Sequence, residues 1–209
     1  VMPRDKVQIE PNWDVMGLNA TGSNDLVVDN VVVPEEWTFI RGSTASLDTP
    51  LYRYPSLSFA TQVLAVVSLG IARAAIDEVI GMASGRTSVT GAPGLGDRIY
   101  VQLEVAKIEA QLRSARCWFY QAIDDAWQEL LAGAPKVSDE KISMLRLSST
   151  HATRAAADVT RRAQMLTGMT GVYESSPLAA QVRDVQMNTQ HAFMGDITYQ
   201  NAGAMLFGH

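Results

Sequence analysis

The chain has little of what marks several classes of protein. Its single cysteine, Cys117, leaves no partner for an internal disulfide, which is typical of a protein in a reducing compartment. We therefore expect a cytoplasmic location. Cys117 stands in a helical pattern among apolar neighbours, so we expect it to pack and not to react. Lysine and arginine form no dense basic patch of the kind that neutralises phosphates, so no nucleic acid is expected as a partner.

Apolar runs of membrane-spanning length are also missing. The longest, residues 60–76, falls short of the roughly 20 apolar residues that a span needs, because it is interrupted by Thr61, Gln62, Ser68 and Arg73. We expect a buried helix there and no membrane partner. No charged segment followed by an apolar one opens the chain, so no signal peptide is expected. The chain instead opens inside a strand-like pattern, and we expect it to be the C-terminal part of a longer polypeptide.

What is present is an ordinary globular composition with an uneven charge. Hydrophobic residues make up 47% and charged residues 19% of the 209, enough for a sizeable core. Residues 1–50 hold three basic and eight acidic side chains, a balance of 3 − 8 = −5, while residues 51–209 hold fourteen of each. All of the net charge of −5 therefore lies in the first quarter, which separates that quarter from the rest.

The first quarter carries the pattern of β-structure. "KVQIE" alternates, "TGSN" breaks the pattern, and "LVVDNVVVP" is rich in β-branched residues and stops at Pro34. These segments are too short to form a sheet domain alone. A loose segment, residues 41–55, follows as a linker. We expect residues 1–48 to be the C-terminal end of a β-domain and residues 49–209 to be a helical bundle domain.

The rest of the chain predicts four long helices. They cover about 56–84, about 97–132, a segment that follows Ser138 and ends near Leu166, and about 177–207 with a break near Gly195. Long amphipathic helices with short loops favour an antiparallel four-helix bundle. The predicted fold class is therefore mainly α, an antiparallel four-helix bundle preceded by a short β segment.

Apolar residues recur at spacings of three and four in each helix, and these stripes predict the core. The first stripe contains Leu57, Ala60, Leu64, Val67, Ile71 and Ala74. The second contains Val101, Val105, Ile108, Leu112, Ala115, Phe119, Ala122 and Ala126. The third contains Ile142, Leu145, Ser149, Ala152, Ala156, Val159, Ala163 and Leu166.

Neither metal ligands nor a phosphate-binding loop stand out. The histidines, His151, His191 and His209, are far apart and form no HExxH pattern, so no metal site is expected. His209 ends the chain, and His151 lies beside the third stripe, where a structural histidine is expected. The glycine-rich loop 85–96 lacks the GK[ST] ending of a Walker motif.

The segment "YESSPLAAQVRDVQMNTQHAF", residues 173–193, raises the question of what His191 contacts. If it is one helix, Asp184, Asn188 and His191 share a face at i, i+4 and i+7. The packing stripe opposite that face would contain Leu178, Val182, Val185, Thr189 and Ala192. A polar face opposite a core face is usually solvated, so periodicity alone favours water around His191.

Several stretches together resemble one family. "WDVMGLNATGSNDLVVDNVVVPEEWTF" resembles the close of the middle β-domain of the acyl-CoA dehydrogenase superfamily, with the pattern W-x-x-x-G-L-R-G-T-G-S-x-D. Asn19 and Ala20 replace the usual Arg-Gly of that pattern. "GRTSVTG", "LTGMTGVYESSPL" and "RDVQMNTQHAF" are similar to stretches of its C-terminal helical domain. The resemblance covers nearly the whole chain and implies that the family's N-terminal helical domain and most of its β-domain lie upstream.

The resemblance implies a flavin, FAD or FMN, and residues that hold it. Arg86 occupies the place of an arginine that contacts the flavin phosphates in this family, and Ser88 is a nearby hydroxyl of suitable chemistry. Val89 stands where dehydrogenases often carry phenylalanine. Gly168 keeps one glycine of a pair that approaches the dinucleotide end of the cofactor.

The resemblance also implies a choice of chemistry. Alignment on Arg183-Asp184 places Ala192 where many dehydrogenases carry the glutamate that removes the substrate's α-proton, and alanine takes no proton. A histidine near the position of His191 is similar to the flavin-dependent monooxygenase branch of the family. This branch includes two-component aromatic hydroxylases and dibenzothiophene monooxygenase, in which reduced flavin reacts with O2. His191 is then the catalytic candidate, as an acid/base or substrate-orienting group.

Three functions follow in order. The first is a monooxygenase that uses reduced flavin and O2 on an aromatic or related small substrate, with a flavin reductase or electron-transfer protein as a possible partner. The second is an acyl-CoA dehydrogenase acting on a CoA thioester. The third is a non-catalytic oligomerisation module, because relatives assemble as tetramers, dimers of dimers, through this domain. For the isolated chain we predict no turnover.

Overall fold

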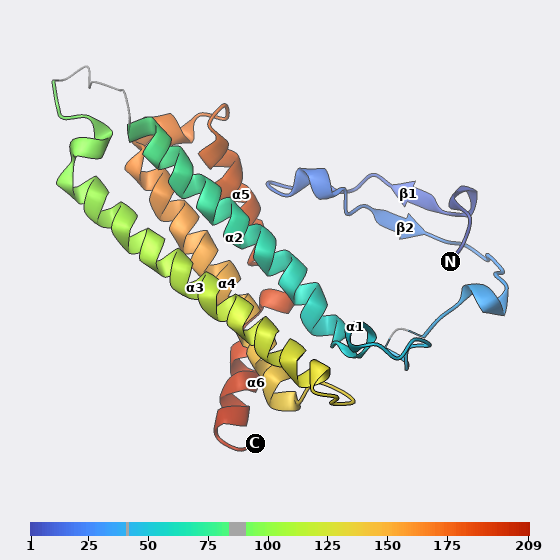
Figure 1. The fold of residues 1–209 in the computed structure, drawn as a ribbon. Helices are drawn as coiled ribbons and strands as arrows, with labels where there is room; N and C mark the ends of the chain where they lie inside the picture. The colour runs from blue at the N-terminus through green and yellow to red at the C-terminus, as the bar shows by residue number, and fades with distance from the viewer. Residues whose placement is uncertain (41, 84–90) are drawn as a thin grey trace.

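Long helices make up most of the molecule, as the stripes predict. The computed structural model describes residues 1–40, 42–83 and 91–209. The three longest helices run side by side, and the β segment lies to one side of them (Figure 1). The helices are α1 (Pro50–Arg53), α2 (Ser56–Ala83), α3 (Ile99–Leu131), α4 (Asp139–Leu166), α5 (Pro177–Asn188) and α6 (Ile197–Leu206). The predicted fold class, a mainly α bundle preceded by a short β segment, is confirmed.

Helix α4 is the centre of the bundle, since it packs against α2, α3, α5 and α6. Its middle consists of small buried side chains, among them Ala152, Ala155 and Ala156. Small side chains let several neighbouring backbones approach one helix closely. The buried hydroxyls of Ser149 and Thr160 donate to carbonyls one turn back in the same helix, to Leu145 O at 2.7 Å and to Ala156 O at 2.8 Å, so their burial leaves no donor unsatisfied.

The predicted core is right for two helices and wrong for one. On α3 and α4 most stripe residues are buried. On α2, Leu57 and Val67 are 44% and 53% exposed, and the buried face instead contains residues such as Ala65, Leu69 and Ile76. Because α2 is apolar nearly all round, its periodicity does not identify the packed face.

The β segment is smaller than its pattern predicts. Strand β1 (Gln8–Glu10) pairs antiparallel with β2 (Asp25–Val27), with Ile9 opposite Leu26. The remainder of "LVVDNVVVP" is not strand, and Val32 is 95% exposed. A β-branched run with no neighbouring strand gains no ladder hydrogen bonds, which accounts for the short pair.

The predicted fourth helix is two helices. Helix α5 ends at Asn188, and a 3-10 turn, Ala192–Met194, precedes α6. The break therefore begins several residues before Gly195. Beyond the helix end, the Thr189 hydroxyl donates to the carbonyl of Gln186 at 2.7 Å. This local bond competes with continuation of the helix.

Two smaller expectations are tested by burial and length. Cys117 is exposed on α3, so the prediction that it packs is wrong. It lies between the buried stripe positions Ala115 and Phe119, on the outer face of the helix. In the part of the chain that the structure describes, none of the helices combines the length and apolar character needed to cross a bilayer.

Candidate functional site

His191 lies in the turn between α5 and α6, and not on a helix face. It is the residue that caps the 3-10 turn Ala192–Met194, where its Nδ1 accepts a hydrogen bond from the backbone N–H of Phe193 at 3.2 Å. The imidazole also packs edge-on against the Phe193 ring, with 4.7 Å between ring centroids. An acceptor role for Nδ1 requires the neutral ring to carry its proton on Nε2.

The Nε2 atom is the nitrogen that remains free for chemistry. Among the described residues it has no hydrogen-bond partner, and the side chain is exposed. The ring is nevertheless held, because the cap and the Phe193 contact fix its orientation. His191 is therefore an oriented N–H group whose outer surface is open to whatever packs on this side of the bundle.

The polar face that periodicity predicts for the fourth helix is not found in the structure. Asn188 is buried at 4% exposure, and its amide donates to Leu64 O at 2.9 Å and to Ser68 Oγ at 2.6 Å on α2. The hydrogen-bonding capacity of α2 draws this polar residue inward, which a hydrophobicity pattern does not reveal. The prediction that Asn188 and His191 share an outer face is wrong.

Asp184 joins α5 to the β segment. Its Oδ1 accepts a hydrogen bond from the backbone N–H of Leu18 at 2.7 Å, although the two residues are 166 positions apart. Gly17 is buried beside this bond, and a Cβ at Gly17 would lie 2.7 Å from the carbonyl carbon and oxygen of Arg183. Only glycine allows this approach without displacing backbone.

Of the three candidate flavin-binding residues, Gly168 lies in the part of the chain that the structure describes. Gly168 lies two residues beyond the end of α4 at φ +56° and is exposed, and a Cβ added to it would meet nothing within 4 Å. A left-handed glycine at this place also ends a helix, so its conformation has a structural cause as well. Arg86 and Ser88 lie outside the described residues.

Arg154 on α4 holds the turn that carries His191. Its guanidinium donates to Met194 O at 3.0 Å, pairs with Asp196 at 2.7 Å and lies 5.1 Å from the Tyr199 ring centroid. Met194 itself is fully buried. The segment after His191 is therefore fastened to α4 by a charged, a polar and an apolar contact.

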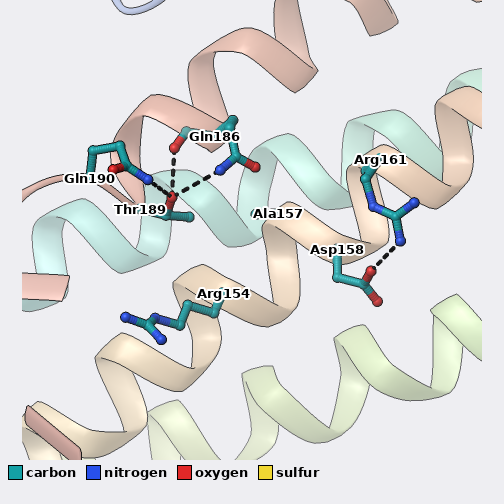
Figure 2. A pocket seen from close by; sticks show the side chains of 7 residues that line it. All are labelled: Arg154, Ala157, Asp158, Arg161, Gln186, Thr189 and Gln190. Carbon is teal, nitrogen blue, oxygen red and sulfur yellow. Dashed lines mark hydrogen bonds and ion pairs between the residues drawn. The ribbon is translucent and has the colours of Figure 1, made fainter. Parts of the chain in front are cut away.

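A shallow depression of about 430 Å³ lies beside these contacts, between α4 and α5. Figure 2 shows the side chains that line it. Within it, Arg161 pairs with Asp158 at 2.8 Å. The hydroxyl of Thr189 is surrounded by the amides of Gln186 and Gln190, which donate to it at 3.3 and 3.2 Å. The polar groups of the depression are thus already engaged with one another.

Ion pairs connect α2, α3 and α4 on the outside of the bundle. Arg162 Nε donates to Glu104 Oε1 at 2.6 Å, which is the main cause that lowers the pKa of Glu104. Hydrogen bonds from Arg113 and then Arg73 lower the pKa of Glu109. Both carboxylates therefore remain charged at pH values below the usual pKa of a glutamate.

The remaining candidates have structural surroundings. His151 is exposed and its ring lies tilted against that of Trp118, with 5.4 Å between ring centroids. No cluster of His, Cys, Asp or Glu that could hold a metal ion occurs within residues 1–40, 42–83 and 91–209. The sequence pattern did not single out Arg154, Gly17 or Phe193. The glycine of "WDVMGL" was the available signal for Gly17.

Comparison with known proteins identifies the family of this helical domain. Residues 62–196 match the family described as "Acyl-CoA dehydrogenase, C-terminal domain", so the chain belongs to this family.

Two curated relatives with high identity are named as monooxygenases. The chain is 64% identical over 208 residues to an indole-3-acetate monooxygenase of Pseudomonas putida, covering 100% of this chain and 53% of that protein. It is 49% identical over 208 residues to the enzyme of the same name from Acinetobacter baumannii, again covering 100% of this chain and 53% of the relative. The chain thus spans about half the length of the curated relatives it matches.

Solved structures share the fold. The 3-HSA hydroxylase of Rhodococcus sp. RHA1 superposes with a TM-score of 0.88 at 22% identity, covering 99% of this chain and 56% of that one. Butyryl-CoA dehydrogenase of Megasphaera elsdenii gives a TM-score of 0.73 at 21% identity, covering 97% and 49%. At this level of identity both show the fold alone.

Proposed function

We propose that this chain supplies the C-terminal helical domain of a flavin-dependent monooxygenase that hydroxylates an arylacetate such as indole-3-acetate. The observation that carries the proposal is the 64% identity to the Pseudomonas putida enzyme over 208 residues. A more distant relative, at 23% identity over 223 residues, is named for 4-hydroxyphenylacetate, another arylacetate. We also propose that residues 1–48 end a β-domain and that residues 49–209 form the helical domain.

The flavin, FAD or FMN, would supply the reaction with O2 that provides the transferred oxygen atom. Gly168 fits such a group because its exposed backbone has no side chain to block approach. We propose Arg86 and Ser88 for the flavin phosphates, on the chemistry of guanidinium and hydroxyl donors. One solved structure of this fold is described in complex with FADH2 and another in complex with FMN.

His191 is the residue that we propose for proton handling. Its Nδ1 is occupied by the Phe193 N–H, so the ring acts through Nε2, which can donate a proton and take it back. An N–H held in one direction also orients a substrate oxygen by hydrogen bonding. The exposure of His191 in this chain supports contact with a neighbouring segment or substrate on that side.

We also propose a homo-oligomer, a dimer of dimers, and a flavin reductase as partner. Exposed apolar residues on α2, such as Leu57, Phe59 and Val63, support a face that another surface covers. A relative named as an oxygenase component supports a separate reductase.

Full-length protein with reduced flavin, 18O2 and indole-3-acetate tests the function. We expect one labelled oxygen atom in the product, by mass spectrometry. A parallel reaction offers oxidised flavoprotein a panel of acyl-CoA thioesters. Bleaching of the flavin by a thioester, without labelled product from the acid, would show a dehydrogenase. Failure to bind any flavin would leave an oligomerisation module.

A further inference from the structure

A cavity of about 250 Å³ lies between the first turns of α4 and helix α6, away from the turn that holds His191. It is lined by Asp139, Ile142, Ser143, Arg146, Thr198, Asn201 and Met205. Its wall combines one guanidinium, one carboxylate, two hydroxyls and an amide with the apolar side chains of Ile142 and Met205. This is the composition of a site for a small molecule with a polar end and an apolar body.

Arg146 is the feature of this cavity that lacks an explanation in the bundle. Its side chain is partly buried, and its Nε is fully buried without any hydrogen-bond partner. Among the described residues its guanidinium forms no ion pair. Burial also lowers the pKa of Arg146 from its ordinary value. A buried charged donor without an acceptor destabilises a protein, so such groups are normally paired.

Other partly buried arginines of this chain have an ion-pair partner. Arg73 pairs with Glu109, although its Nε also lacks a hydrogen bond, and Arg162 pairs with Glu104 at 2.6 Å. The carboxylate nearest in the cavity lining, Asp139, does not serve Arg146. It is 78% exposed and pairs with Lys136 at 3.7 Å. The guanidinium of Arg146 therefore lines a partly apolar cavity without a charged partner among the described residues.

We propose that the cavity between α4 and α6 binds a carboxylate through Arg146. A carboxylate matches the planar fork of a guanidinium with parallel hydrogen bonds. The hydroxyl of Ser143 and the amide of Asn201 line the same space and can donate to its oxygens. Ile142 and Met205 then contact the apolar part of the ligand, and a thioether next to an aromatic ring is a favourable contact.

The carboxylate has two possible sources with the same chemistry. It belongs either to a free organic acid or to an acidic group of another polypeptide segment placed on this cavity. The cavity is built from α4 and α6 alone, so its binding of a carboxylate does not depend on the proposed monooxygenase activity. It has one link to that site, because Thr198 in the cavity wall donates to Phe193 O at 3.5 Å, next to His191.

The test compares full-length wild type with Arg146→Gln, Arg146→Lys and a control, Arg113→Gln, whose side chain is 80% exposed on α3. Calorimetric titration uses phenylacetate and its uncharged amide, phenylacetamide, as probes. For a free acid, we expect wild type to bind phenylacetate and not the amide. Arg146→Gln should weaken that affinity about tenfold or more, as loss of a charge-assisted hydrogen bond predicts. Arg146→Lys should be intermediate, and Arg113→Gln unchanged.

For a polypeptide carboxylate, no Arg146-dependent binding of the probe occurs. Arg146→Gln then lowers Tm by several degrees and Arg146→Lys restores part of the loss. Arg113→Gln loses only an exposed ion pair with Glu109, so its effect on Tm should be much smaller. The proposal is overturned if probe binding does not depend on Arg146 and Arg146→Gln melts at or above the temperature of wild type. If Arg146→Gln does not fold, Arg146→Lys and the comparison of acid with amide decide the same question.

Discussion

The backbone N–H of Leu18 donates to Asp184 Oδ1 at 2.7 Å, and this bond joins the β segment to helix α5 across 166 residues. Asp184 belongs to the Arg183-Asp184 pair on which the alignment that identified His191 is based. The bond thereby holds the β segment against α5, which is the helix that leads into the His191 turn.

Replacing Asp184 tests the strength of this bond. We expect Asp184→Ala to lower the free energy of unfolding by roughly 1–3 kcal/mol, because the Leu18 N–H then loses a charged acceptor. Asp184→Asn should cost less, since an amide oxygen still accepts. Urea unfolding measures both, and Asp124→Ala on the exposed face of α3 is the control. Equal unfolding curves for Asp184→Ala and the control would contradict the expectation.

Gly17 permits the same contact by its lack of a side chain. Gly17→Ala places a Cβ 2.7 Å from the backbone carbonyl of Arg183, and overpacking of this kind typically costs about 1–3 kcal/mol. Gly203→Ala on α6 is the matched control, because nothing lies within 4 Å of its Cβ position. That control should be neutral or stabilising by about 0.5–1 kcal/mol. Thermal unfolding that ranks the two variants the other way would refute the steric argument.

His191 allows its cap to be separated from its proton. His191→Asn keeps a side-chain acceptor for the Phe193 N–H, whereas His191→Ala removes it. We expect both variants to lose product formation by about 100-fold or more, as for loss of a general acid or base. Only His191→Ala should also lower Tm. Normal turnover in His191→Asn, measured as product per unit time, would remove His191 from the chemistry.

Arg154 is expected to act through the turn that it holds. Arg154→Met loses the bonds to Met194 O and Asp196, so the His191 turn becomes less fixed relative to α4. We expect a several-fold fall in the amount of product formed per reduced flavin oxidised. Hydrogen peroxide should account for the remaining oxidation of the flavin. Arg154→Lys should recover part of it through Asp196. Arg161→Met, in the same depression, serves as control, and an equal loss in that variant would point to a general effect of charge (Figure 2).

Acid should weaken the bundle through its inter-helix ion pairs. The bond from Arg162 lowers the pKa of Glu104 below its ordinary 4.5. A folded-state pKa below the unfolded value means that the stabilisation is complete above the unfolded pKa. It is lost as the pH falls through the folded pKa, so the loss lies below about pH 4.5. Tm measured from neutral pH downward should fall less steeply in Glu104→Gln than in wild type. Exposed Glu174→Gln should follow the wild-type curve.

Local patterns were sufficient where one side of a helix alone is apolar. On α3, the predicted positions Ile108, Leu112 and Phe119 are buried, and charged residues occupy many of the exposed positions of that helix. On α2, apolar residues occur on every side, so only the neighbouring helices decide that Leu69 is buried and Val67 exposed.

Hydrogen bonds from side chains to the backbone account for most of the features that periodicity did not predict. The end of α5 depends on Thr189 and on the cap from His191, which a periodicity of 3.6 residues does not contain. The Leu18 to Asp184 bond depends on two segments meeting in space. Family resemblance, and not periodicity, identified His191 as a candidate, and its role stays a prediction.

The buried amide of Asn188 sets the axial alignment of α5 against α2. Its donors reach Leu64 O and Ser68 Oγ, so a shift of one residue, about 1.5 Å along the helix, would break both bonds. The hydroxyls inside α4 bond within their own helix and impose no such alignment. The position along the bundle axis at which α5 ends and the His191 turn begins therefore depends on the side chain of Asn188, three residues before His191.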